Sequence, residues 1–199
     1  MPLFVDVLDI WLQVLAWGLL TGAVWVLYRF ALAKDPQAAA NLDRGFGYIS
    51  TAIGIYALAM GLWGSFTWPL PSSYNLVLMD PYALYGIAYL ALGLSLIYGA
   101  DLRGPLWGVA FLSISPIVYG ADILYYHLTL EPAAATAMFV VIGVAGLLSP
   151  LLTFRRVSRY WAYVEAVLLI IGALLSAYIG ASATFEHTAD WMKWTPFYG

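Results

Sequence analysis

Long apolar stretches divide this chain of 199 residues, and they constrain its fold more than any motif does. A helix that spans a membrane needs about 20 mostly apolar residues, because the hydrocarbon core of a bilayer is roughly 30 Å thick. With 63% hydrophobic and 10% charged residues, the chain has too little polar surface for a soluble globule. The sequence predicts an all-α, polytopic membrane protein in which residues 1–199 form a single domain of six transmembrane helices. The expected spans are Leu8–Leu32, Gly45–Thr67, Pro81–Gly99, Pro105–Tyr126, Pro132–Thr153 and Tyr160–Ser182.

The basic residues indicate how these helices are oriented. All but one of the eight lysines and arginines lie in alternate gaps between the apolar stretches: Arg29, Lys34, Arg44, Arg103, Arg155, Arg156 and Arg159. Loops with such an excess of positive charge stay in the cytoplasm. We therefore expect both the N and the C terminus on the extracytoplasmic side of the plasma (cytoplasmic) membrane.

Prolines and small residues indicate how the helices begin and pack. Pro81 follows Asp80, and we expect this pair to open the third helix with Asp80 as its N-cap. Ser115 and Pro116 predict a bend in the fourth helix, because a proline inside a helix removes a backbone hydrogen bond. Small residues let membrane helices approach closely, within the chain or against a neighbouring subunit. The small residues expected at such contacts are Gly54, Ala57, Gly61, Gly86, Gly93, Gly104, Gly108, Gly172, Ser176 and Gly180.

Two acidic residues lie well inside predicted spans, away from their first or last residues, and Glu165 is the deeper of them. It sits about one and a half turns into the sixth helix from its cytoplasmic end. Burying a carboxylate there is costly unless it is protonated or paired. One interpretation is structural, with Glu165 paired to Arg155, Arg156, Arg159 or a tyrosine hydroxyl. The other is functional, with Glu165 as a station in a proton or ion relay.

The second acid is Asp122, in the outer quarter of the fourth helix. Tyr119 and Tyr126 lie on its face at helical spacing, whereas His127 meets it only where the helix ends or bends. On this topology Asp122 faces the same side as several other polar groups, so we expect an outer pocket beneath the 68–80 loop. Its candidate residues are Tyr74, Asn75, Asp80, His127, Glu186, His187 and Asp190.

The histidines near these carboxylates are also compatible with a metal site. His127, His187 and either Asp122 or Asp190 would supply its mixed nitrogen and oxygen ligands. No pair of them has the spacing of a known zinc or di-iron motif. A solvated acidic rim explains the same residues, and both interpretations stay open on the sequence alone.

Missing residues and motifs exclude several classes of protein. With no cysteine, the chain cannot hold iron–sulfur clusters, thiolate zinc or disulfides. Its two histidines lie outside the spans, which argues against haem bound by histidines within the bilayer. It has no Walker loop, GxSxG elbow or HExxH motif, and its basic residues are confined to short membrane-facing loops. We expect no cofactor, no catalytic constellation and no binding of nucleic acid.

One segment resembles a known family. The stretch WPLPSSYNLVLMDPYALYG has paired prolines, then Tyr-Asn, then Asp-Pro before a glycine-bearing helix. It is similar to a segment of an uncharacterised family of archaeal and actinobacterial multi-pass membrane proteins of about this length. The resemblance implies an architecture and no activity, and it makes Tyr74, Asn75, Asp80 and Pro81 the positions to test first. The alternative is a loop held by an asparagine turn and a helix cap.

Three functions are compatible with these observations. The leading hypothesis is a non-enzymatic scaffold or accessory subunit that packs in the lipid bilayer against itself or other membrane subunits. The second is a small proton- or cation-coupled transporter in which Asp122 near the outer face and Glu165 near the inner face lie on one path. The third is a metal or redox site on the outer face. No internal repeat relates the first three spans to the last three, which counts against the transporter without excluding it.

Overall fold

The computed structural model describes residues 8–192, apart from the side chains of Pro36, Asp190 and Trp191. Every regular element in that range is helical. In chain order they are α1 (Leu8–Val26), η1 (Leu27–Leu32), α2 (Pro36–Thr67), α3 (Tyr74–Tyr98), α4 (Arg103–Leu112), α5 (Ile114–Tyr126), α6 (Pro132–Leu148), η2 (Ser149–Thr153) and α7 (Ser158–Trp191). Six helical segments of the described range are long and apolar enough to cross a membrane. The predicted all-α fold with six spans is confirmed.

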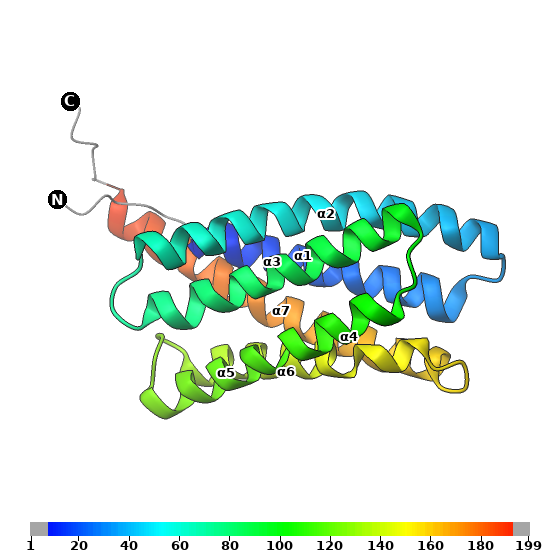
Figure 1. The fold of residues 1–199 in the computed structure, drawn as a ribbon. Coiled ribbons are helices and arrows are strands. Elements are labelled where there is room, and N and C mark those ends of the chain that lie inside the picture. The colour runs from blue at the N-terminus through cyan, green and yellow to red at the C-terminus, as the bar shows by residue number, and fades with distance from the viewer. Residues whose placement is uncertain (1–7, 193–199) are drawn as a thin grey trace.

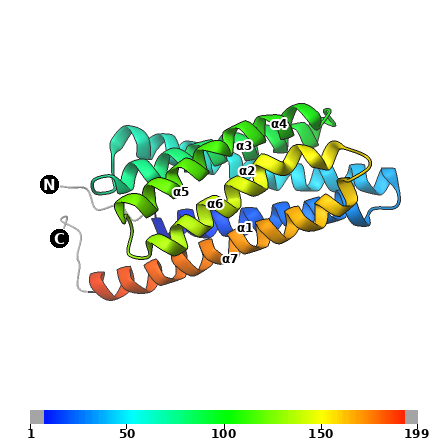
Figure 2. The same ribbon diagram turned by 90° about the horizontal axis from the view of Figure 1, so that it is seen from below.

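The helices lie lengthwise beside one another in an elongated bundle (Figure 1). α2 packs along α3, α1 along α7, and α5 along α6. Figure 2 shows the α1 and α7 pair from a second direction. α1 begins and α7 ends at the same end of the bundle in both views, as an even number of crossings requires.

The helix bounds agree with the predicted spans in part. α1 with η1, and α6 with η2, have the predicted bounds. α2 begins before the predicted Gly45, because the carboxylate of Asp35 caps it by accepting from the backbone N–H groups of Gln37 (3.1 Å) and Ala38 (3.3 Å). α7 continues past the predicted end at Ser182. The second and sixth spans are therefore longer than hydropathy alone indicates.

The prediction that Asp80 caps the third helix is wrong. α3 begins before Asp80, and both Asp80 and Pro81 lie within it. Asn75 accounts for the earlier start, since it is fully buried and ties the preceding turn together. Its side-chain oxygen accepts from the N–H of Leu70 at 3.2 Å, and its amide group donates to the carbonyl of Gly64 at 3.0 Å. The loop between α2 and α3 is consequently shorter than predicted.

The fourth span is broken between α4 and α5, close to the bend predicted at Ser115 and Pro116. The break falls at Ser113, whose hydroxyl donates to the carbonyl of Val109 at 2.7 Å. Pro116 has no N–H to offer the carbonyl of Leu112, so the helical hydrogen-bond ladder is interrupted. α4 packs against α3, α6 and η2, whereas α5 packs mainly along α6.

Glycines hold α2 and α3 close together. A Cβ atom added to Gly54 or Gly86 would lie 2.6 Å from the Cα atom of Leu90 or Leu58 on the other helix, and Gly61 is equally close to its neighbour. Real Cβ contacts are not that short, so only glycine permits this approach. The predicted small-residue faces of the second and third helices therefore pack against each other.

The other small-residue faces have different surroundings. The hydroxyl of Ser176 on α7 donates to the carbonyl of Leu12 at 2.8 Å, and Gly180 also lies against Leu12. A Cβ atom added to Gly104 or Gly108 would meet no atom of the described chain within 4 Å. Their face of α4 is thus open.

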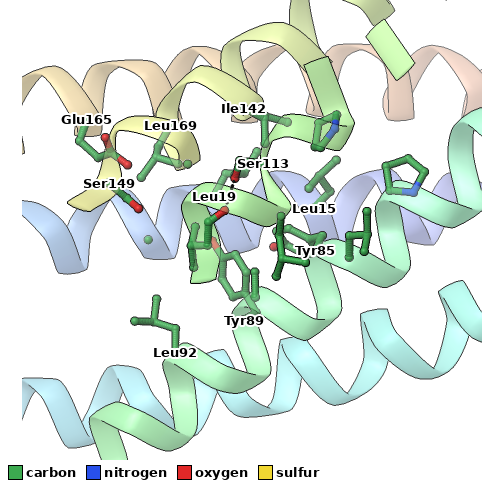
Figure 3. A pocket seen from close by; sticks show the side chains of 18 of the residues that line it. Leu15, Leu19, Tyr85, Tyr89, Leu92, Ser113, Ile142, Ser149, Glu165 and Leu169 are labelled. Atoms are coloured by element: carbon green, nitrogen blue, oxygen red, sulfur yellow. Dashed lines mark hydrogen bonds between the residues drawn. The ribbon is translucent and has the colours of Figure 1, made fainter. Parts of the chain in front are cut away.

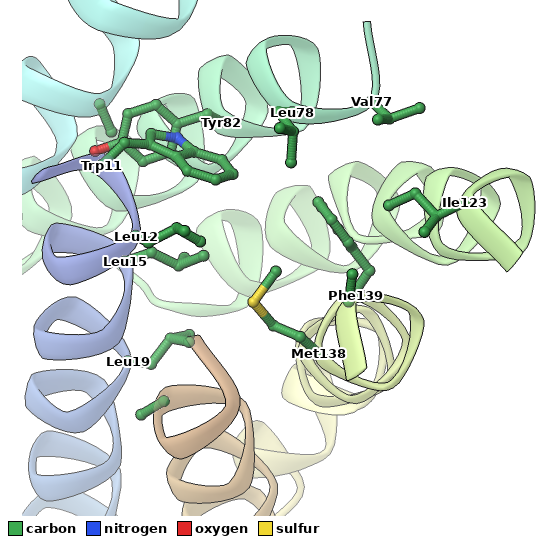
Figure 4. Packing of buried hydrophobic residues seen from close by; sticks show 13 residues of the cluster. Trp11, Leu12, Leu15, Leu19, Val77, Leu78, Tyr82, Ile123, Met138 and Phe139 are labelled. Carbon is green, nitrogen blue, oxygen red and sulfur yellow. The ribbon is translucent and has the colours of Figure 1, made fainter. Parts of the chain in front are cut away.

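Buried side chains form two apolar clusters, one toward each end of the bundle. Figure 4 shows the first, in which Trp11 and Tyr82 lie above Met138 and Phe139. The rings of Trp11 and Tyr82 meet edge to face, with their centroids 4.8 Å apart. The second cluster is built around Trp25. Members of both clusters line a cavity in the centre of the bundle.

Candidate functional site

A cavity of about 120 Å³ lies between the helices. Its walls come from α1, α3, the α4–α5 span, α6 with η2, and α7. The α1 residues that line it run from Trp11 to Val26, which are about 22 Å apart along the helix at a rise of about 1.5 Å per residue. That length covers most of a hydrocarbon core roughly 30 Å thick. The cavity is therefore the candidate route through the membrane.

The cavity wall is mainly aliphatic and aromatic. Its few polar side chains include Tyr85, Tyr89, Ser113, Ser149 and Glu165, and no lysine, arginine or histidine lines it. Figure 3 shows Glu165 and Ser149 on one side of the cavity, with Tyr85 and Tyr89 on another. Such a wall offers a small solute a few hydrogen bonds in otherwise apolar surroundings.

Tyrosines of α3 line the cavity at helical spacing. The rings of Tyr85 and Tyr89 lie 4.4 Å apart, and that of Tyr82 lies 5.9 Å from Tyr85. Gly18 and Gly22 of α1 make room for them: a Cβ atom at Gly18 would overlap the hydroxyl of Tyr85, and one at Gly22 would lie 3.0 Å from that of Tyr89. The hydroxyl of Tyr89 donates to the Gly18 carbonyl at 2.7 Å. These two glycines thus leave the room on α1 that the tyrosine side chains of α3 occupy.

Glu165 is the acid that lines the cavity. Only 4% of its surface is exposed, and it makes no hydrogen bond or ion pair with any residue in the range 8–192. The basic residues considered as its structural partners, Arg155, Arg156 and Arg159, are exposed. A buried acid without a partner is costly inside a membrane, and such residues usually belong to functional sites.

Asp122, the other predicted relay residue, does not line the cavity. It is half-buried on α5, and Tyr119 on the same helix donates to Asp80, at 3.3 Å. His127 ends α5 in the left-handed region, with a φ of 52°, and is exposed. Of the two predicted relay stations, the cavity includes Glu165 alone.

The residues expected to share an outer pocket make separate contacts. Asp80 accepts from the hydroxyl of Ser65 at 2.7 Å, and Asn75 is engaged in the turn between α2 and α3. Nδ1 of His187 lies 2.9 Å from a carboxylate oxygen of Asp9, which joins α7 to α1. Leaving aside His187 and Asp190, no hydrogen bond or ion pair between described side chains joins two of the candidate pocket residues.

The remaining candidates do not complete a metal site. Tyr74 packs against the apolar core, Glu186 is exposed, and the side chain of Asp190 lies outside the described residues. Among the side chains that are described, no three of His, Cys, Asp or Glu lie close enough together to hold a metal ion. The outer metal site stays a prediction, and no such group of described side chains supports it.

Residues 1–190 match a family whose description is "Protein of unknown function (DUF981)". The chain belongs to the DUF981 family. No curated protein matches the sequence of this DUF981 member. The resemblance to an uncharacterised membrane-protein family is confirmed at this level, while the archaeal and actinobacterial range stays a prediction.

Two solved structures are similar to this DUF981 protein. The crystal structure of the urea channel from the human gastric pathogen Helicobacter pylori matches with a TM-score of 0.59 at 17% identity, over 90% of this chain and 98% of that chain. The cryo-EM structure of the Helicobacter pylori urea channel in a closed state matches with a TM-score of 0.58 at 19% identity, over 90% and 97% of the two chains. At these identities the likeness establishes the fold: a multi-pass bundle of membrane helices.

Sequence reasoning located Glu165 in this DUF981 protein but missed the rest of the cavity wall. Tyr82, Tyr85 and Tyr89 repeat at intervals of three and four residues, which marks one face of a helix and was legible in the sequence. Ser113 and Ser149 carried no such signal, because serine is common at helix ends and breaks. Their place in the wall follows from how the helices pack.

Proposed function

We propose that this protein is a channel or facilitator that passes small, uncharged polar solutes across a membrane through the central cavity. The observation that carries the proposal is the cavity itself, whose lining residues on α1 span about 22 Å and whose wall includes Glu165, a buried acid with no partner among the described residues. The fold shared with a protein named as a urea channel adds support.

The composition of the wall favours uncharged solutes. An ion that crosses a membrane needs its hydration shell replaced by several oxygens or by rings of charged side chains. This cavity offers one acid, Glu165, and no basic residue. Urea is the first solute to test, because it is small and neutral and because it is named for the similar structures.

Transport accounts for the site better than the scaffold hypothesis does. A scaffold requires neither a central cavity nor a buried acid that has no partner among the described residues, as Glu165 is here. The open face of Gly104 and Gly108 is compatible with packing against another copy or another membrane subunit, in addition to transport. Proton or cation coupling would be an extension of this function in which Glu165 binds the coupling ion, without Asp122 in the same cavity.

We also propose that the cytoplasmic end of the bundle is the one near Glu165, with both termini outside. The basic residues support this orientation, because Arg29, Lys34 and Arg44 flank the α1–α2 loop and Arg155, Arg156 and Arg159 precede or open α7, at the end of the bundle near Glu165. Since the chain has no cysteine, Ser72→Cys supplies a single label site in the α2–α3 loop. An impermeant thiol reagent should label it in intact cells, and labelling only from the cytoplasmic side would reverse the orientation.

Solute flux into proteoliposomes tests the function. Urea should equilibrate faster across vesicles that contain the protein than across protein-free vesicles, as followed by light scattering. Ala88→Phe places a ring in the cavity and should slow urea at least about tenfold, whereas Ala91→Phe on the exposed face of α3 should not.

Both alanine variants should first elute from a size-exclusion column like the wild type, which makes them a matched pair. Flux that is unchanged in Ala88→Phe contradicts the route through the cavity. Flux no faster than in empty vesicles, for urea, formamide and glycerol alike, contradicts the channel.

A further inference from the structure

The serines of the cavity wall have already donated their hydroxyl hydrogens. Ser113 donates to the carbonyl of Val109 at 2.7 Å, and Ser149 donates to the carbonyl of Leu106 at 3.2 Å. A hydroxyl group has one hydrogen and two lone pairs. Because each hydrogen is held by a backbone carbonyl, the two oxygens can only accept hydrogen bonds from a molecule in the cavity.

Further acceptors lie along the same wall. The hydroxyl hydrogen of Tyr89 is likewise held by a backbone carbonyl, that of Gly18 at 2.7 Å, so its oxygen can only accept a further hydrogen bond. At the break between α4 and α5, Pro116 cannot donate to the carbonyl of Leu112, and both residues line the cavity. The Leu112 carbonyl near Ser113 therefore lacks its usual helical donor.

Glu165 completes this set. It is 4% exposed and has no partner among the described residues, and like Ser149 it lines the cavity (Figure 3). An ionised carboxylate only accepts hydrogen bonds, and a protonated one still accepts with its second oxygen. No arginine, lysine or histidine in the wall supplies donors to it.

We propose that Ser113, Ser149 and Glu165 form an acceptor site that selects neutral solutes rich in N–H donors, such as ureas and primary amides. The proposal rests on the channel function and names its substrate class. A solute that brings N–H groups satisfies the buried acceptors, whereas one that brings none leaves them without water or partner. Sites built around hydrogen bonds reject analogues that lack them strongly, so we expect discrimination of at least about tenfold.

The site favours neutral molecules over cations that carry the same N–H groups. A cation such as methylammonium must lose its hydration in a wall that is aliphatic and aromatic apart from a few hydrogen-bonding groups, which include the hydroxyls of Tyr82 and Tyr85 as well as the acceptors. Urea and primary amides present N–H donors without that cost. Comparing the flux of urea with that of methylammonium therefore distinguishes a preference for neutral N–H donors from a preference for cationic ones.

The test compares solutes in the same proteoliposomes. Urea should cross at least about ten times faster than trimethylamine N-oxide, which is compact and polar but has no hydrogen-bond donor. Urea should also cross faster than methylammonium. Ser113→Ala and Ser149→Ala should each slow urea, and Glu165→Gln should lower the ratio of urea to trimethylamine N-oxide flux because the amide group adds donors to the site.

Ser95→Ala is the matched control. Ser95 donates to the carbonyl four residues earlier, Ala91, at 2.7 Å, as Ser113 does to Val109, but it lies outside the cavity. Its urea flux and solute ratio should equal those of the wild type.

Each outcome decides a separate point. If urea and trimethylamine N-oxide cross equally fast, the acceptor site is overturned and the channel function stands. The same holds if Ser113→Ala and Ser149→Ala leave the urea flux unchanged. Methylammonium flux above that of urea overturns the preference for neutral solutes. Flux of no solute at all overturns the channel, and the acceptor site with it.

Discussion

The two faces of α3 differ in how they meet their neighbours. Toward α2, Gly86 and Gly93 bring the two helix backbones into direct contact. Toward the centre of the bundle, Tyr82, Tyr85 and Tyr89 line a cavity. One face holds the helix in place, and the other leaves volume unfilled. The difference teaches that a cavity inside a small bundle depends on close packing elsewhere, because the surrounding helices must resist collapse into it.

The largest effect is expected from breaking the close-packed face. In Gly86→Leu the new Cβ atom would lie 2.6 Å from the Cα atom of Leu58, so α2 and α3 must separate. We expect the free energy of unfolding in mixed micelles to fall by about 3 kcal/mol. Gly108→Leu is the control, because an added Cβ atom there meets nothing within 4 Å. Equal losses in both variants would contradict the role assigned to the glycine contact.

A smaller loss is expected at the turn that joins the two close-packed helices. Asn75→Ala removes a buried donor and a buried acceptor, whose partners are the carbonyl of Gly64 and the N–H of Leu70. The free energy of unfolding should fall by about 2 kcal/mol. Asn41→Ala, at an exposed position of α2, should leave it within about 0.5 kcal/mol of the wild type. Unfolding in denaturing detergent, followed by circular dichroism, measures both.

The cavity face should respond in the opposite way, with little change in stability and a large change in function. Glu165→Gln keeps the shape of the side chain and removes no ion pair or hydrogen bond within the described chain. We expect its free energy of unfolding to stay within about 1 kcal/mol of the wild type while the solute selectivity changes. Glu186→Gln, an exposed acid on the same helix, should change neither. A large loss of stability in Glu165→Gln alone would favour a structural role.

The smallest effect is expected in a loop outside both faces. A hydrogen bond from the Arg103 side chain, together with one from its backbone N–H, lowers the pKa of Asp101 to about 2. An acid with a lower pKa in the folded state adds stability at neutral pH that is lost as the pH falls through that value. Both side chains are exposed, so water and salt screen the pair. Asp101→Asn should shift the melting temperature only slightly at pH 7, and this shift should disappear as the pH falls below about 2.

The membrane fold was predictable because each span is marked in the sequence by its own run of apolar residues. The first and fifth spans were predicted at both ends from runs of apolar residues. The start of α3 was not predicted. It depends on the hydrogen bonds that Asn75 accepts from Leu70 and donates to Gly64, which exist only in the folded chain. Asp80 followed by Pro81 looks like a helix start, yet α3 runs through both residues.

The candidate site was predictable only where a single residue carries the signal. Glu165 could be found because an acid inside an apolar helix is rare and costly. Asp122 gave a similar signal, but its position near a helix end places it away from the cavity. The cavity itself was beyond sequence reasoning, since its existence depends on the faces that five spans turn toward one another.

The central claim is that water and small solutes enter the space between α3 and the helices that face it, and cysteine accessibility tests it most directly. The natural chain has no cysteine, so Ala88→Cys in the cavity and Ala91→Cys on the exposed face of α3 each carry a single thiol. A small water-soluble methanethiosulfonate should modify Ala88→Cys in membranes and block urea flux, because thiolates form only where water reaches. It should leave Ala91→Cys unmodified in the lipid. Modification of Ala91→Cys with Ala88→Cys unreactive would contradict the account.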